Sequence, residues 1–235
     1  MPRARLTRST IVDACIGVMQ GGNDLTFARL GGRLGVDPTA VYRHFRDKDE
    51  LLRAVTDRIL GPVTVGLPAG RPATWRTVVT EVCVRLRHAH LSHPRLAAPS
   101  QPGPPMQANE FAITEVLLTS LRAAGLSERN AALAYHALIE LTVGSASLDA
   151  MMAGLDDDER DAAYAAWRRA YAALDPASHP TSVAVAPSLY AGTADERFRY
   201  ALDRLLDGIA GSVGGGGGAP AQAPAAIAPS APVRR

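Results

Sequence analysis

The residues from Asp37 to Phe45 carry the side chains best suited to binding another molecule. Asp37 and Pro38 form the expected start of a helix, with Asp37 as N-cap and Pro38 at the first helical position. Val41 and Phe45 lie four residues apart, so both face one interior. The outward residues are then small, hydroxylated, aromatic or cationic: Thr39, Ala40, Tyr42, Arg43 and His44. Such a surface suits phosphate oxygens and base edges in a DNA groove.

A second short helix must precede this surface and hold it at an angle. Thr26 can cap that helix, and Leu30 and Leu34 face its interior at a spacing of four residues. Gly35 can adopt the left-handed backbone that ends a helix without a Cβ clash. Two short helices around such a turn predict a helix-turn-helix, whose second helix enters the major groove of DNA.

Two glycines lie inside the first helix of this motif, where each costs roughly 1 kcal/mol relative to alanine. Gly31 falls where the two helices cross and a small residue is needed. Gly32 has no such role, and we expect it only to loosen the helix.

In this segment the chain resembles the TetR family of transcriptional regulators. Residues 7–15 are similar to the family's first helix, with Thr7 as a cap. The segment from residue 34 to residue 52 resembles the family's recognition helix, the turn after it and the start of the fourth helix. The residues that carry this resemblance are Leu34, Gly35, Val36, Val41, Tyr42, His44, Phe45, Lys48, Leu51 and Leu52. The resemblance implies a DNA-binding regulator.

We expect Tyr42 and Lys48 to contact mainly phosphates, and Thr39, Arg43 and His44 to reach base edges, with Arg43 best suited to guanine. Lys48 is the only lysine among arginines, which indicates that a compact ammonium is needed there. A surface lysine without a role is the alternative. The DNA-contacting set is Thr26, Arg29, Pro38, Thr39, Ala40, Tyr42, Arg43, His44 and Lys48.

The charge of the chain is distributed in keeping with this set. The 235 residues hold 25 Lys and Arg against 23 Asp and Glu, a formal net charge of +2. Residues 1–60 hold ten basic and seven acidic side chains, whereas the remainder holds fifteen and sixteen. The small basic excess therefore accompanies the motif, as attraction to phosphate requires.

Beyond Leu60 a segment rich in proline and glycine, with Pro62, Gly66, Pro68, Gly70 and Pro72, separates the motif from a larger region. Apolar spacing there predicts helices over 75–91, 107–124, 127–152, 156–174 and 195–213, with an irregular stretch before the last and no strand pattern. The fold class is therefore all-α, with a DNA-binding domain over 1–60, a regulatory and dimerisation domain over 72–213, and a disordered tail over 214–235. Residues 121–127 and 198–209 and the apolar helix between them resemble the tetracycline-repressor-like regulatory domain of the same family.

We expect a homodimer that joins through the helices over 131–152 and 195–213, since each carries more apolar positions than one side of a small bundle uses. One helix-turn-helix reads too few base pairs to select a site, so the operator should be an inverted repeat. A small, largely apolar ligand should bind between the helices over 75–91, 107–124 and 131–152. Candidate lining residues are Leu86, His90, Phe111 and His136.

Other clusters have simpler readings. His88, His90 and His93 point to different sides of one helix and lack a Cys or carboxylate partner, so we expect no metal. The acidic run 156–159 is typical of a helix start rather than of a calcium loop. Cys15 and Cys83 are expected to be buried and reduced.

Two features of the long helix stay open. His136 and Glu140 lie one turn apart, so they could line a ligand cavity, pair across a dimer interface or satisfy each other. The small residues 144–147 permit close helix approach, either to a partner subunit or within the chain.

The sequence therefore predicts a cytoplasmic, ligand-responsive repressor without cofactor, since we find no secretory leader and no apolar run of the roughly 18 residues that span a membrane. An activator or a non-inducible regulator is the alternative of the same class. An enzyme with a DNA-binding arm is the alternative of another class, but no nucleophile and base, phosphate loop or metal set has a recognisable spacing.

Overall fold

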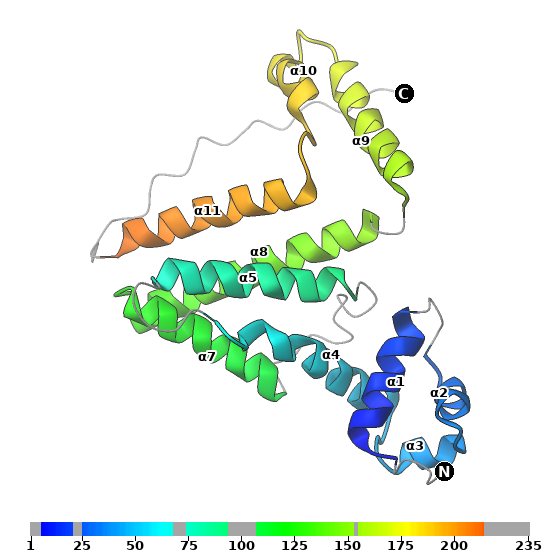
Figure 1. Cartoon of the computed structure of the whole chain (residues 1–235). Coiled ribbons are helices and arrows are strands. Elements are labelled where there is room, and N and C mark those ends of the chain that lie inside the picture. Colours follow the sequence, from blue (N-terminus) through cyan, green and yellow to red (C-terminus); the bar gives the residue numbers. More distant parts are fainter. Residues whose placement is uncertain (1–5, 21–24, 68–73, 94–106, 153–154, 214–235) are drawn as a thin grey trace.

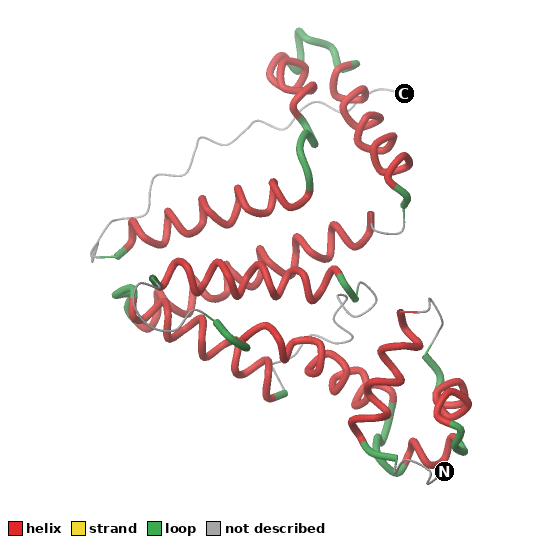
Figure 2. The backbone as a smooth tube through the Cα atoms, in the orientation of Figure 1, coloured by secondary structure: helices red, strands yellow, loops and turns green. Residues whose placement is uncertain are grey.

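The computed structural model describes residues 6–20, 25–67, 74–93, 107–152 and 155–213 (Figure 1). All regular elements within these ranges are helices, which confirms the all-α prediction (Figure 2). The expectations for Pro68, Gly70, Pro72 and the tail over 214–235 lie outside the described residues.

The first domain is a small helical unit at one end of the molecule (Figure 1). It consists of α1 (Arg8–Gln20), α2 (Phe27–Leu34), α3 (Pro38–Tyr42) and the first half of α4 (Lys48–Thr64). The buried side chains of these helices and of the turn between α3 and α4 form one apolar cluster, which includes Ile11, Cys15, Leu30, Val41, Phe45, Leu51 and Val55. This core fixes α3 against α1, α2 and α4.

Helix α4 belongs to both domains. Leu51 and Val55 lie in the first core, whereas Leu60 and Val63 lie in the second. The boundary predicted at residue 60 therefore falls inside α4, which continues through Pro62. Pro62 has no N–H to donate to the carbonyl of Arg58, so α4 lacks that backbone hydrogen bond, while Leu60 and Val63 beside it are buried in the second core.

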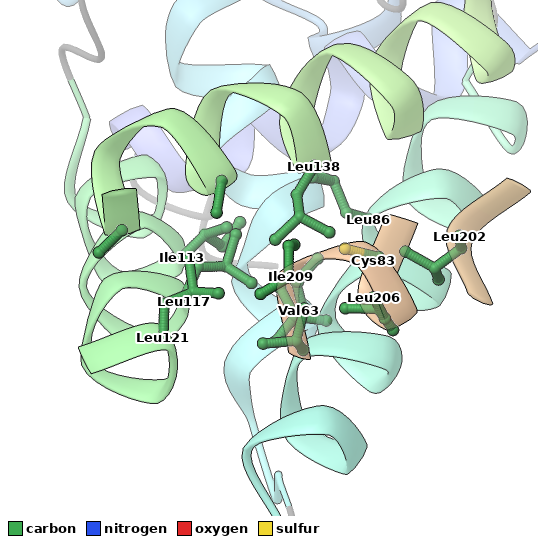
Figure 3. Packing of buried hydrophobic residues seen from close by; sticks show 14 of the residues in the cluster. Val63, Cys83, Leu86, Ile113, Leu117, Leu121, Leu138, Leu202, Leu206 and Ile209 are labelled. Carbon is green, nitrogen blue, oxygen red and sulfur yellow. The ribbon is translucent and has the colours of Figure 1, made fainter. Parts of the chain in front are cut away.

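The second domain packs α5 (Trp75–Leu91), α7 (Ala108–Ala123), α8 (Glu128–Met152) and α11 (Ala194–Ser212) around a larger core. Figure 3 shows leucine, isoleucine and valine side chains from these helices and from α4 pointing toward one another. Leu117, Leu138 and Leu206 are fully buried. Apolar contacts of Leu60 and Val63 thus fix the end of α4 to this second core.

Helices α9 (Asp157–Ala172) and α10 (Pro180–Val185) and the short η1 (Ala186–Ser188) pack on one another and stand apart from the core helices (Figure 1). The Asp156 carboxylate accepts a hydrogen bond from the Glu159 amide at 2.8 Å, which confirms the acidic helix start. The stretch expected to be irregular contains α10, because Pro180 occupies the first turn of that helix, where proline is favoured.

Helix α8 corrects one expectation. It is long and apolar enough to cross a membrane by length and composition, although we expected no such run. It packs against α5, α7 and α11, and Leu138 at its middle is fully buried. These contacts are those of the central helix of a helical domain.

Both cysteines are free and buried, as predicted. Burial raises the pKa of the Cys15 thiol and of the Cys83 thiol to about 11 in each case. Both therefore stay protonated near neutral pH, and a protonated thiol is a poor nucleophile.

The two glycines of α2 make a matched pair for a stability test. A Cβ at Gly31 would lie 2.8 Å from the Val36 carbonyl oxygen and 3.1 Å from the Pro38 nitrogen, whereas a Cβ at Gly32 would meet nothing within 4 Å. We expect Gly32→Ala to raise the free energy of unfolding by about 0.5–1 kcal/mol. Gly31→Ala should lower it by about 1–3 kcal/mol, because backbone atoms must move apart. Urea unfolding measures both, and equal effects of the two substitutions would contradict this assignment.

Candidate DNA-binding surface and ligand-binding region

Three local caps set the angle between α2 and α3. The Thr26 hydroxyl accepts a hydrogen bond from the Arg29 amide at 3.1 Å, as predicted for an N-cap. Gly35 has a φ of +66°, the left-handed conformation expected of it. The Asp37 carboxylate accepts from the Thr39 amide at 2.8 Å and caps α3. The helix-turn-helix geometry therefore arises from residues close together in sequence.

The exposed side of α3 carries the side chains expected to meet DNA. Val41 and Phe45 are fully buried beneath it. Thr39 and Arg43 are exposed, and 59% of the Tyr42 side chain is accessible. The Tyr42 ring contacts the edge of the Phe27 ring at 4.5 Å between centroids, so α2 supports it. Arg43 and His44 follow the last residue of α3 and lie in the turn toward α4.

The hydrogen bonds of Thr39 restrict what it can offer a base. Its hydroxyl donates to the Asp37 carboxylate at 2.6 Å. This bond and the amide bond hold the pKa of Asp37 below its usual value, so the carboxylate stays ionised near neutral pH. Thr39 Oγ1 is left as an acceptor, which favours a base that presents an amino group in the major groove.

Arg8 is a positioning residue that sequence reasoning missed. Its guanidinium donates to the His44 carbonyl oxygen, lies over the Phe45 ring at 4.1 Å, and pairs with the Glu50 carboxylate at 3.0 Å. The Arg46 amide and then Arg8 hold the pKa of Glu50 below its usual value. No local signal could reveal Arg8, because His44 lies 36 residues away.

Lys48 is the first residue of α4, next to the N-cap Asp47, and it is exposed. A cation is unfavourable beside the partial positive charge of a helix N-terminus. A bound phosphate would favour both the ammonium and the helix end, so this position suits a phosphate contact.

The structure brings the DNA-contacting set together on α2, on α3 with its following turn, and at the start of α4. Of that set, the exposed members are Thr26, Arg29, Thr39, Tyr42, Arg43 and Lys48, and the half-buried members are Pro38, Ala40 and His44.

The four ligand-lining candidates do not meet in one place. Leu86 is buried in the second core, and His90 is half-buried on the same helix. Burial lowers the pKa of His90, so its ring is neutral near pH 7. Phe111 is 56% exposed on α7, and His136 is exposed on α8. Within one protomer, Phe111 and His136 therefore face outward, away from Leu86.

The structure shows the surroundings of the polar pair and of the small residues on α8, for which the sequence left several interpretations open. His136 and Glu140 are both exposed, and the His136 ring contacts Tyr135 edge-on at 5.4 Å. Among the small residues 144–147, Ala146 is fully buried within the protomer and Gly144 is exposed. The protomer's own packing therefore accounts for Ala146.

A buried arginine is the second residue that sequence reasoning missed. Arg87 on α5 is 1% exposed and lies 2.7 Å from the Asp149 carboxylate of α8 and 3.4 Å from the Asp195 carboxylate of α11. It also donates to Ser145 Oγ at 3.3 Å and lies over the Phe198 ring at 4.8 Å. The sequence could have indicated a buried Arg87, because this arginine lies on an otherwise apolar face of the helix. Arg87 joins three helices of the regulatory core, and it lines a cavity of about 570 Å³ that reaches α9.

His88 of α5 and His93, which follows the end of α5, have different surroundings. His88 Nε2 lies 3.9 Å from the Asp195 carboxylate, and His93 Nε2 lies 3.5 Å from Gln20 Nε2. Within the described part of the chain, no group of three or more His, Cys, Asp or Glu side chains could hold a metal ion.

Helices α8 and α11 both carry exposed apolar side chains. Leu133, Leu148 and Met151 of α8 are 54%, 68% and 78% exposed, and Tyr200 of α11 is 70% exposed. A hollow of about 420 Å³ between the two helices is lined by Leu133 and Leu205, among others. Exposed apolar side chains beside such a hollow are typical of an interaction surface.

Two family descriptions match the chain. Residues 18–55 match bacterial regulatory proteins of the tetR family, and residues 67–213 match the tetracyclin repressor-like C-terminal domain. The transcriptional repressor Rv1353c of Mycobacterium tuberculosis is 30% identical over 194 residues, which cover 79% of this chain and 72% of that protein.

Solved structures agree with these matches. The transcriptional regulator SCO7222 of Streptomyces coelicolor, described as a TetR, is 28% identical, with a TM-score of 0.76 over 89% of this chain and all of that one. ActR of Streptomyces coelicolor, in complex with actinorhodin, is 25% identical, with a TM-score of 0.79 over 90% of this chain and all of that one.

Proposed function

Because the chain belongs to the TetR family of bacterial transcriptional regulators, we propose that it is a repressor that binds operator DNA as a homodimer and leaves it when a small molecule binds. The observation that carries this proposal is the capped helix-turn-helix with Thr39, Tyr42 and Arg43 exposed beside Lys48. In this proposal Tyr42 and Lys48 grip phosphates, and Arg43 reads a guanine.

Ligand response is supported by the relatives and by the role of α4. Rv1353c is named a repressor, and ActR has been solved with actinorhodin bound. In this chain α4 starts beside the recognition helix and ends in the regulatory core. Asn109 of α7 also holds α4, since its backbone N–H donates to the Asp57 carboxylate at 2.8 Å and its side-chain amide donates to the Asp57 carbonyl oxygen at 3.0 Å. A ligand that shifts α7 or α5 would therefore tilt α4 and change the separation of two recognition helices.

The exposed apolar face of α8 and α11 is the proposed dimer interface. Two copies related by a two-fold axis would cover Leu133 and Leu205 and would present two recognition helices to an inverted repeat. The protein then acts where the chromosome lies, in the cytoplasm, and its interaction with its effector is binding without turnover. Measuring the effector before and after incubation separates this function from an enzymatic one.

Two substitutions test DNA recognition with different expected signatures. Arg43→Ala should relax the preference at one base position and cost about 1–3 kcal/mol there. Lys48→Ala should weaken binding to all sequences alike and lower the slope of log affinity against log salt by about one. Fluorescence anisotropy on the operator and on single-base variants, at several salt concentrations, measures both.

The operator for these titrations comes from genome-wide recovery of DNA bound to the protein. Arg169→Ala is a matched control, since this exposed arginine lies on α9, far along the chain from the motif. Operator affinity of both test variants equal to that of Arg169→Ala would show that the DNA surface lies elsewhere. Transcription from the bound promoter with and without the protein separates a repressor from an activator.

A further inference from the structure

A cavity of about 520 Å³ lies at the junction of the two domains, between α1, α4 and α5. Figure 1 shows α4 running from the DNA-binding domain toward α5 and α7. The apolar part of its lining comes from all three helices and includes Ile16 of α1, Ile59 and Val63 of α4, and Ala89 of α5. A molecule held there would contact both domains at once.

The polar part of the lining is basic. Arg58, Arg85, His88 and His93 all line the cavity, and no carboxylate does. The carboxylates that orient three of these groups belong to residues outside the lining. Asp13 pairs with Arg58 at 3.1 Å, Glu81 pairs with Arg85 at 2.7 Å, and Asp195 lies 3.9 Å from His88. Arg58 and Arg85 are therefore held in place by carboxylates outside the lining, and the formally charged side chains of the lining are these two arginines.

The cavity beside Arg87 provides a contrast within the same chain. It has a similar volume, about 570 Å³, but balanced charge. Its charged lining residues are Arg87, Arg160, Arg168, Asp149, Asp161 and Asp195. A lining with equal numbers of arginines and carboxylates favours neither sign of ligand charge, whereas an apolar lining with arginines and no carboxylate favours a molecule that is partly apolar and partly anionic.

We propose that the junction cavity binds an amphipathic organic anion, with its apolar body on Ile59, Val63 and Ala89 and its anionic group beside Arg85. This site is separate from the ligand region expected between α5, α7 and α8, because neither Leu86 nor His90 lines it. An anion there would fix the orientation of α1 relative to α5. Binding of the anion would therefore also change the affinity for DNA, without any rearrangement of the second core.

The test uses 8-anilinonaphthalene-1-sulfonate, a fluorescent probe with an apolar body and one sulfonate, titrated into the full-length protein. Ala89→Trp should fill the cavity and remove one bound probe per protomer. Arg85→Gln should weaken binding of that probe by at least about fivefold, because a charge-assisted hydrogen bond is lost. Ala170→Trp and Arg169→Gln, both on exposed positions of α9, are the matched controls and should bind the probe like the unmutated chain.

A neutral probe of the same shape, N-phenyl-1-naphthylamine, separates charge recognition from general damage to the fold. Arg85→Gln should leave its binding unchanged, and thermal melting should confirm that each variant is folded. An unchanged stoichiometry and affinity for the sulfonate in Ala89→Trp and Arg85→Gln would overturn the proposal, as would equal loss of both probes in Arg85→Gln. Because the readout needs no DNA, the anion site can be disproved without affecting the proposed repressor function, and the repressor function can be disproved without affecting the anion site.

Discussion

Leu133→Glu should convert the homodimer into monomers and lower operator affinity by at least about 100-fold. Leu133 is 54% exposed in the protomer and lines the hollow between α8 and α11, so a partner subunit would bury it. A carboxylate buried there without a partner strongly destabilises the interface. Two linked DNA-binding domains gain about 10²–10⁴ in affinity over one, and the monomer loses that gain. Sedimentation analysis and anisotropy on the operator measure the two effects.

The choice of position decides whether this experiment reports on dimerisation or on folding. Ile209 also lies on α11 but is only 6% exposed, so it belongs to the protomer's own core, and a charge there would unfold the chain. Leu205 is half-buried and gives a second test of the interface. Val65→Glu is the matched control, since Val65 is 70% exposed and lies after α4, away from α8 and α11. A dimer that persists in Leu133→Glu would place the interface elsewhere.

Arg87→Ala should lower the free energy of unfolding by about 3–5 kcal/mol, the range for removal of one partner of a buried ion pair. Arg87 is 1% exposed, and its loss leaves the Asp149 carboxylate without the cation 2.7 Å away. The substitution also removes the contact with the Phe198 ring and leaves a void between α5, α8 and α11. Urea unfolding followed by circular dichroism measures the change.

Three further variants show whether the effect comes from the buried charge. Arg85→Ala on the same helix should cost far less, because the Arg85 side chain is 30% exposed and solvent can replace its partners. Arg87→Lys should be intermediate, since it keeps the charge without the planar fork. Arg87→Met combined with Asp149→Leu should recover much of the loss, because it removes the buried guanidinium together with the carboxylate that pairs with it. A loss below about 1 kcal/mol in Arg87→Ala would mean that the ion pair has no structural role.

The DNA-binding motif was predictable because its geometry comes from short-range interactions. The bonds from the Arg29 amide to Thr26 and from the Thr39 amide to Asp37 each span two or three residues. The left-handed backbone at Gly35 depends on that residue alone. Helix ends were harder to predict near proline, because Pro180 starts α10, where proline is favoured, whereas α4 continues through Pro62.

The sequence by itself determined the all-α class, the helix-turn-helix and the exposure of Thr39, Tyr42 and Arg43, since caps, turns and helical spacing are local properties of the chain. Only the tertiary structure decided that α4 is shared by two cores, that Phe111 faces outward, and that Arg87 meets Asp195. The contact between Arg87 and Asp195 spans 108 residues, and it forms only when separate helices pack together. Apolar spacing shows which face of a helix is buried but not which helix covers it, so the partners of a buried residue depend on the packing of the whole chain.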